Sequence, residues 1–240
     1  MREFEITEEE KLKLCRSIEK ARLVPAPENS LGQWIGNFID AGAIVILDEV
    51  CEEISMEGKT SIEAIPKKGD GLIKIKNTLG QFKQIDHVIR REGKNELIVE
   101  VKWLKDQRHL NDKGAWVLMM TDILIENKEL KGIIAILAGP WEAMRKVIEK
   151  RAKVIIIPIS NVYNSLSNRG INITIDTSRN AYENPGETLN AMLNEIENKT
   201  RIGQNLLEEV GYEILSPYKS ELKEKILSLF SSPTRLSLPY

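Results

Sequence analysis

The chain has 240 residues, 42% of them hydrophobic, and a formal net charge of −2 at pH 7, which is typical of a globular protein with one core or a core with an added lobe. No apolar run is long enough to cross a membrane, and the charged start Met1–Glu5 does not look like a signal peptide. Cys15 and Cys51 form no CxxC pair and are expected to be reduced thiols in a cytoplasmic protein, and having only two histidines, His87 and His109, gives little support to zinc hydrolase or Ser–His–Asp chemistry.

Helical patterns dominate the first 56 residues. Residues 7–22 are predicted to form a charged amphipathic helix, with Thr7 and Glu10 placed as a capping box. A second helix is predicted over 30–56, because apolar residues recur there at helical spacing. That apolar stripe consists of Leu31, Ile35, Phe38, Gly42 and Val45.

Strands are expected to appear after residue 59. The Gly- and Lys-containing region 59–80 is predicted to hold a short helix at 60–66 and a short strand at 72–75. Residues 83–104 predict a β-hairpin, because two segments rich in Val and Ile flank a polar stretch that contains a glycine.

Helices and strands alternate through the middle of the chain. The elements predicted here are a helix from Asn111 or Asp112 to about Asn127, a strand at 132–137, a helix at 141–151 after Pro140, and a strand at 154–159. Both strands are continuous apolar runs, as expected for strands that are covered on both faces. The order predicts an α/β protein.

The last third of the chain is expected to form a mostly helical C-terminal lobe over 161–240, packed as one globular unit on a core formed by 1–160. Residues 161–175 are polar with alternating isoleucines, a pattern typical of an edge strand or hairpin. The helices expected here are 187–198, 202–210 ended by Gly211, and a last amphipathic helix that starts at Ser216-Pro217, before a tail at 233–240.

Three charged residues lie within the apolar segments of the predicted hairpin: Asp86, Glu100 and Lys102. Charges in such surroundings are costly unless they are paired or bind a metal. Because residues i and i+2 of a strand share a face, Glu100 and Lys102 are expected to project together, while Val101 and Trp103 point into a core. These three charged residues are therefore the first place to look for chemistry.

The length of the hairpin loop decides whether Asp86 joins the other two residues. An odd loop (92–94 or 91–95) puts Asp86 directly opposite Glu100, where the Cβ atoms of cross-strand partners are roughly 4.5–5.5 Å apart. An even loop, such as a two-residue turn at Gly93-Lys94, is expected to break this pairing.

Two carboxylates with water in the remaining positions suit Mg²⁺, which keeps several waters and often also binds substrate phosphate. Asp86 and Glu100 are the expected metal ligands, and the carbonyl of Val101 between the two side chains is a further candidate ligand. Lys102 is expected near the metal-bound water or a charged phosphate oxygen. The chemistry that this set predicts is hydrolysis of a phosphodiester.

Asp86 followed by Glu100-Val101-Lys102 resembles the signature of the PD-(D/E)XK nuclease superfamily, which contains many type II restriction endonucleases, although Ile85 stands where the named proline would be. The predicted order of elements over roughly 30–160 is also similar. The resemblance implies a restriction-endonuclease-like three-layer core with a mixed central sheet flanked by helices, plus the C-terminal lobe for recognition or dimerisation. It gives catalytic roles to Asp86, Glu100 and Lys102.

The superfamily often adds an acidic residue from the helix that precedes the hairpin. Glu49 continues the stripe of Phe38, Gly42 and Val45 at helical steps, so we expect Glu49 at the site, with Glu53 one turn later as the alternative. A solvated helix end explains an acidic cluster equally well.

The net negative charge is a point against nucleic-acid binding, which usually leaves a basic footprint. Residues 59–94, however, carry nine basic and four acidic residues, a net charge of +5, and lead into the predicted site. An ordinary Lys-rich surface explains that charge as well. Candidate base-reading residues are Arg108, His109, Asn111 and Arg169.

The favoured hypothesis is a Mg²⁺-dependent type II restriction endonuclease, a site-specific hydrolase of double-stranded DNA that acts as a homodimer because two strands need two sites. The first alternative is another nuclease of the superfamily, acting in repair, recombination or RNA processing. The second is a non-catalytic DNA-binding protein on the same fold, which the joint presence of Asp86, Glu100 and Lys102 disfavours.

Overall fold

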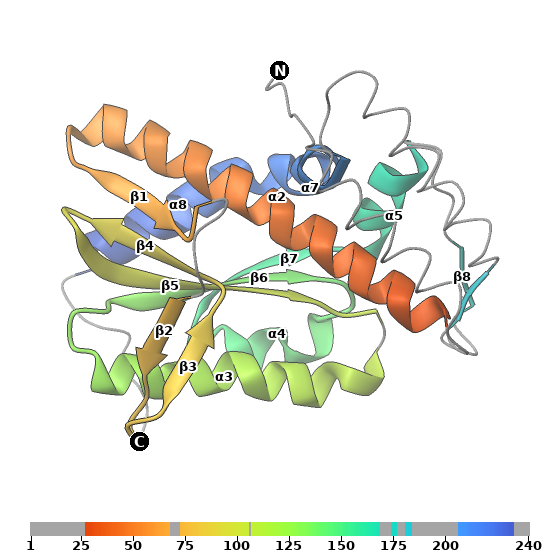
Figure 1. Cartoon of the computed structure of the whole chain (residues 1–240), viewed down its shortest axis with the longest axis horizontal. Coiled ribbons are helices and arrows are strands. Elements are labelled where there is room, and N and C mark those ends of the chain that lie inside the picture. The colour runs from red at the N-terminus through yellow and green to blue at the C-terminus, as the bar shows by residue number, and fades with distance from the viewer. Residues whose placement is uncertain are drawn as a thin grey trace.

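The computed structural model describes residues 27–67, 73–105, 107–168, 174–176, 181–183 and 206–232 (Figure 1). A five-stranded mixed sheet forms its centre, in the order β1-β4-β5-β6-β7. β4 runs antiparallel to both β1 and β5, whereas β5, β6 and β7 run parallel to one another. The strands are β1 (Ile62–Ile65), β4 (His87–Arg91), β5 (Lys94–Trp103), β6 (Gly132–Ala138) and β7 (Lys153–Ile157).

Helices cover both faces of this sheet (Figure 1). One face carries α2 (Pro27–Gly58), α5 (Ile159–Ser167), α7 (Leu206–Leu215) and α8 (Lys219–Ser231). The opposite face carries α3 (Leu110–Glu126), α4 (Glu142–Ile148) and the small β2–β3 hairpin (Ile73–Lys76 and Phe82–Ile85). The short elements are η1 (Gln107–His109), η2 (Ser216–Tyr218) and the pair β8 (Thr174–Asp176) and β9 (Ala181–Glu183). The prediction of an α/β protein with a mixed sheet flanked by helices is confirmed.

Alternation along β5 divides its side chains between two hydrophobic clusters. Leu97, Val99, Val101 and Trp103 pack in the cluster on the α2 side. Ile98 and Leu104 pack in the cluster on the α3 side, so Glu100 and Lys102 belong to that second face, as predicted. All seven residues of β6 are buried, which confirms that its continuous apolar run is covered on both faces.

Three predicted elements differ in the structure. The segment predicted as a helix over 60–66 contains strand β1 (Ile62–Ile65) instead, since Ile62 and Ala64 alternate into the core while the strand pairs with β4. Residues 159–167 form helix α5, where the sequence predicted polar strand. Helix α7 continues through Gly211 to Leu215. The predicted helices 7–22 and 187–198 and the tail 233–240 lie outside the described residues.

The C-terminal helices belong to the same helical layer as α2. Six apolar residues of α7 and α8 lie in the hydrophobic cluster that α2 shares with the sheet: Val210, Ile214, Leu215, Leu222, Ile226 and Leu229. Helices α7 and α8 therefore share the hydrophobic cluster that lies between α2 and the sheet.

The described helices include none that is long and apolar enough to span a membrane. Cys51 is a buried free thiol, and burial raises its pKa to about 12, which makes the thiolate rare at neutral pH.

Two glycines set the distance between α2 and α7. A Cβ atom built on Gly42 would lie 2.3 Å from the carbonyl carbon of Gly211, and a Cβ atom on Gly211 would lie 2.1 Å from the carbonyl oxygen of Phe38. Both contacts are with backbone atoms, which cannot move aside as a flexible side chain can. The two helices therefore cross at a distance that only glycine allows, and this explains why Gly211 lies inside a helix that we expected it to end.

We predict that Gly42→Ala lowers the free energy of unfolding by about 1–3 kcal/mol, because the new methyl group forces α2 and α7 apart. Gly36→Ala is the matched control on the same helix, where the nearest atom to an added Cβ is 4.0 Å away. That change should stabilise the protein by about 0.5–1 kcal/mol, the ordinary gain of replacing a helical glycine. Urea unfolding measures both values, and equal stabilisation by the two changes would contradict the tight crossing.

Candidate active site

The β4–β5 hairpin closes with a two-residue turn, Glu92-Gly93, and not with the odd loop that we expected to bring Asp86 opposite Glu100. The φ angles of 50° and 76° at these two residues lie in the left-handed region that tight hairpin turns require. Next to the turn, Arg90 pairs with Asn95. That register alone would put Asp86 opposite Val99.

A β-bulge at Glu96 restores the predicted pairing. The register shifts between Ile89 and Arg90, so that Ile89 pairs with Leu97 and His87 with Val99. Continued by one residue, this register brings Asp86 opposite Glu100. The prediction that an even loop breaks this pairing was wrong, because the extra residue of the bulge gives the same result as an odd loop.

The bulge residue is held by two cations from neighbouring strands and loops. The Glu96 carboxylate lies 2.8 Å from Arg91 Nη2 and 3.0 Å from Lys131 Nζ, and only 12% of its side chain is exposed. Arg91 is the last residue of β4, and Lys131 immediately precedes β6. The two ion pairs therefore connect the bulge to β4 and β6, the neighbours of β5 in the sheet. The register at Asp86 is therefore fixed by charge as well as by backbone pairing.

Lys102 lies between the two predicted metal-binding carboxylates. Its Nζ atom is 2.5 Å from Asp86 Oδ2 and 2.7 Å from Glu100 Oε2. It also donates to the carbonyl oxygen of Val101 at 3.0 Å, and the backbone N–H of Val101 donates to Asp86 Oδ2 at 2.9 Å. The structure thus brings together Asp86, Glu100, Val101 and Lys102, four of the residues that the sequence singled out.

Burial strongly affects the charges of this group. The Glu100 side chain is 0% exposed, and burial together with the nearby Asp86 charge raises its pKa to about 7 in spite of the opposing effect of Lys102. Burial alone would lower the pKa of Lys102, but the Glu100 and Asp86 carboxylates outweigh it and raise that pKa above its usual range.

Asp86 and Lys102 lie beside two cavities at the C-terminal end of β5. Among the described strands, β5 beyond Val99 has no partner on the β4 side and pairs only with β6, through Glu100 to Trp103. A cavity of about 520 Å³ adjoins this edge, and a second of about 410 Å³ lies between β5, the β3 end and α3. Asp86 and Lys102 line both cavities.

Helix α2 contributes Asp40 to the larger cavity. Asp40 is exposed by surface area, but protein atoms around its carboxyl reduce its solvation and, with the charge of Asp86 as the second cause, raise its pKa to about 6. Lys113 of α3 lines the same cavity and donates to the carbonyl oxygen of Trp103. Sequence reasoning missed Asp40, although it lies two residues after Phe38 of the apolar stripe, because a single acidic residue on a helix carries no signal of its own.

The structure does not bring Glu49 to this site. Glu49 lies nine residues beyond Asp40, about 13 Å along the helix axis at 1.5 Å per residue. Its Oε2 atom lies 2.8 Å from Lys219 Nζ and accepts a hydrogen bond from the Tyr212 hydroxyl at 3.3 Å. Glu53, the alternative, pairs with Lys219 and Lys223. Glu49 therefore connects α2 to α7 and α8, Glu53 connects α2 to α8, and neither lies beside Asp86 and Lys102.

The histidines and candidate readers have different surroundings. His87 is 5% exposed, and burial lowers its pKa to about 4, so its imidazole is neutral near pH 7. His109 is exposed and lines the larger cavity. Asn111 is exposed at the start of α3, and Arg169 and the side chain of Arg108 lie outside the described residues.

A divalent cation fits the chemistry of these atoms. Glu100 Oε1 is buried and has no hydrogen-bond partner, so it offers an acceptor to a cation or water. The Val101 carbonyl oxygen and the Asp86 carboxylate both accept hydrogen bonds from Lys102 Nζ. Among the described residues, no group of three or more acidic, histidine or cysteine side chains is arranged to enclose a metal ion. The oxygen atoms that face one another here come from two carboxylates and a carbonyl, a small set that would suit a cation that keeps several waters.

No family model, curated protein or solved structure matches this chain. Its function must therefore be inferred from the geometry of the site.

We predict that Glu100→Gln stabilises the metal-free protein at pH 8 by roughly 1–3 kcal/mol, because it removes a buried charge. The Glu100 pKa of about 7 lies above its ordinary value of 4.5, so the wild-type protein loses stability as the pH rises between these values. The advantage of the variant should thus grow from pH 4.5 to 7 and then level off.

Urea unfolding in the presence of a chelator measures this pH dependence. Glu126→Gln, at an exposed position at the end of α3, is the matched control and should show little change with pH. A Glu100→Gln variant that is less stable than wild type at pH 8 would show that the Lys102 ion pair outweighs the cost of burial.

Proposed function

We propose that the protein is a Mg²⁺-dependent nuclease of the PD-(D/E)XK type that hydrolyses phosphodiester bonds of double-stranded DNA. The single observation that carries the proposal is the position of Lys102 Nζ, within 2.7 Å of the facing carboxylates of Asp86 and Glu100. A helix, an antiparallel β1–β4–β5 meander, a second helix and a parallel strand surround this group, which agrees with the order expected of a restriction-endonuclease-like core.

The proposed chemistry is the addition of water across one P–O bond. Oxygen from water bonds to phosphorus, the bond from phosphorus to one sugar oxygen breaks, and that oxygen takes up a proton. A bound Mg²⁺ supplies Lewis acidity toward the phosphate and makes bound water more acidic. Asp86, Glu100 and the Val101 carbonyl would hold the ion.

Lys102 is suited to carry positive charge beside the reacting phosphate. In the metal-free arrangement its ammonium group occupies the space between the two carboxylates. Its side chain is 18% exposed and lines both cavities, so it has room to turn toward a phosphate oxygen. There it stabilises negative charge that develops as the bond to phosphorus breaks.

The favoured role is a type II restriction endonuclease that acts as a homodimer, because the two strands of a duplex require two sites. A nuclease of repair or recombination is the alternative with the same chemistry. The buried, closely packed charges favour either enzyme over a non-catalytic binding protein, since such charges lower stability without a structural benefit.

We predict that Lys102→Ala or Asp86→Ala lowers Mg²⁺-dependent DNA cleavage by at least about a hundredfold while the protein stays folded. Lys94→Ala changes an exposed lysine at the other end of β5 and should cleave normally. Plasmid and phage DNA with Mg²⁺ or with chelator provide the assay, and circular dichroism checks the fold.

The products separate the alternatives. Discrete fragments support the restriction enzyme, whereas smearing or a preference for branched substrates supports a nuclease of repair or recombination. Binding without cleavage in every divalent metal tested would rule out both enzymes.

We predict that Asp40→Asn weakens cleavage by about tenfold to a hundredfold, because Asp40 lines the cavity beside Asp86 and Lys102. Glu49→Gln should leave cleavage within about twofold of wild type, since its ion pair with Lys219 lies on the far part of α2 and is worth little. Initial cleavage rates measured side by side test this distinction. The opposite ranking would mean that α2 contributes through Glu49 as the sequence suggested.

A further inference from the structure

The β2–β3 hairpin presents two chemically different faces. Its register pairs Lys74 with Gln84 and Lys76 with Phe82, and these four residues are exposed. The inner face packs against the α3-side cluster through Ile73, Ile75 and Ile85. Phe82 is 63% exposed, which is unusual for a phenylalanine that has a core available on the other face of its own hairpin.

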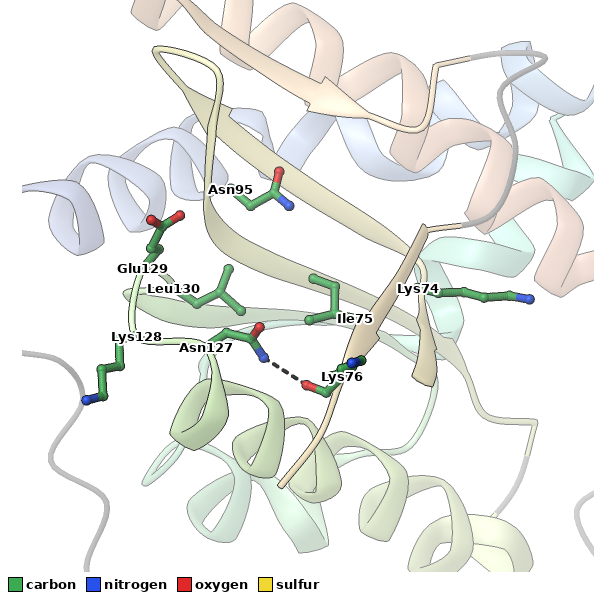
Figure 2. Close-up of a pocket in the computed structure, with 8 residues that line it drawn as sticks. All are labelled: Lys74, Ile75, Lys76, Asn95, Asn127, Lys128, Glu129 and Leu130. Carbon is green, nitrogen blue, oxygen red and sulfur yellow. Dashed lines mark hydrogen bonds between the residues drawn. The ribbon is translucent and has the colours of Figure 1, made fainter. Parts of the chain in front are cut away.

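The hairpin is rigidly built. The Oδ1 atom of Asn77 accepts hydrogen bonds from the backbone N–H groups of Leu79 and Gln81, at 3.1 and 2.9 Å. The side-chain amide of Asn127, just beyond α3, donates to the carbonyl oxygen of Lys76 at 2.8 Å (Figure 2). The outer face is therefore held in place relative to the sheet and α3.

A cavity of about 450 Å³ lies beside β2, between this strand, the loop after α3 and Asn95 of β5. Figure 2 shows Ile75 on the cavity side of β2 and Lys74 pointing away from it on the opposite side. The ammonium group of Lys74 is thus directed outward and not into this cavity.

All charged residues of the hairpin are basic. Residues 73–85 contain three lysines, Lys74, Lys76 and Lys83, and no acidic residue, although the whole chain carries a net charge of −2. Within the described ranges, none of these lysines forms an ion pair with a carboxylate. The Nζ atom of Lys76 instead lies 5.4 Å from the centre of the Phe82 ring.

The outer face also leads directly to the candidate active site. Gln84 lines the cavity that contains Asp86 and Lys102. From Asp86 back to Phe82 the chain spans four residues, about 13 Å at the rise of an extended strand. Each strand of B-DNA carries one phosphate per roughly 3.4 Å of helix axis, so this length reaches along about four of them.

We propose that the outer face of the β2–β3 hairpin (Lys74, Lys76, Phe82 and Gln84) binds duplex DNA beside the bond that is cut. Lys74 and Lys76 contact phosphates, which gives affinity, and Phe82 and Gln84 contact the groove, where a two-stranded ribbon fits. This inference rests on the proposed function for its choice of duplex DNA, because the hairpin ends at the metal-binding carboxylate.

The test is the salt dependence of DNA binding by the full chain in chelator, where no cleavage occurs. A fluorescent 30-base-pair duplex is titrated with wild type and with the double variant Lys74→Ala/Lys76→Ala. Loss of two phosphate contacts should lower the slope of log affinity against log salt by about 2 and weaken binding at least tenfold near 0.1 M salt. Phe82→Ala should weaken binding without changing the slope.

The double variant Lys146→Ala/Lys150→Ala is the matched control, since it removes the same charge from exposed positions in and just after α4. Its slope should equal that of wild type. A slope that falls equally in both double variants would overturn the proposal, because it would indicate a general effect of net charge. Tighter binding to single-stranded DNA or RNA than to duplex, or no nucleic-acid binding at all, would also overturn it.

The outcomes separate this proposal from the proposed function. If wild type cleaves DNA and the hairpin variant binds duplex as wild type does, the hairpin proposal fails and the nuclease stands. If the hairpin variant loses binding as expected but wild type cleaves in no divalent metal, the hairpin proposal stands and the nuclease fails.

Discussion

The candidate active site is built around a fully buried carboxylate. Glu100 lies in the middle of the central sheet, its side chain fully buried, and the pKa of about 7 records how unfavourable its charge is there. Lys102 offsets part of this cost but is itself mostly buried. A hydrophobic residue at position 100 would fit a strand between two apolar layers better. A site that retains this cost is more simply explained by chemistry than by stability.

Several separate elements are needed to bring the charged groups together. β4 begins at His87, just after Asp86, and its pairing with β5 reaches only to Val99. Within the described sheet, the C-terminal part of β5 therefore has an open edge on the β4 side. α2 reaches this opening with Asp40, and α3 reaches it with Lys113. The glycine contact between α2 and α7 fixes the path of α2, and apolar side chains of α7 and α8 pack in the same hydrophobic cluster as α2. The C-terminal helices thus support the site without lining it.

Much of the fold could be predicted from the sequence, because long apolar periods specify α2, α3 and the parallel strands. The group of Asp86, Glu100 and Lys102 could be predicted as well, since charges within apolar strands are rare. The bulge at Glu96 could not, because the residues that pair with Glu96 include Lys131, which is distant in the sequence and gives no local signal. The sequence pointed to Glu49 and not to Asp40 for a related reason. The apolar stripe gives the buried face of α2, but the position along its axis that meets the sheet edge depends on how far β4 extends.

The short turn and the bulge compensate for each other, and this has a consequence for how the sequence can change. Adding or deleting one residue at Glu92-Gly93 alone would turn Glu100 and Lys102 to the α2 face and bring Val101 out of the core. A one-residue change there is tolerated only with a second, opposite change at the bulge. Insertions of two residues in the turn keep every side chain on its own face. Among descendants of this sequence, the number of residues between Asp86 and Glu100 should therefore change only by even numbers, even where the turn residues themselves are replaced.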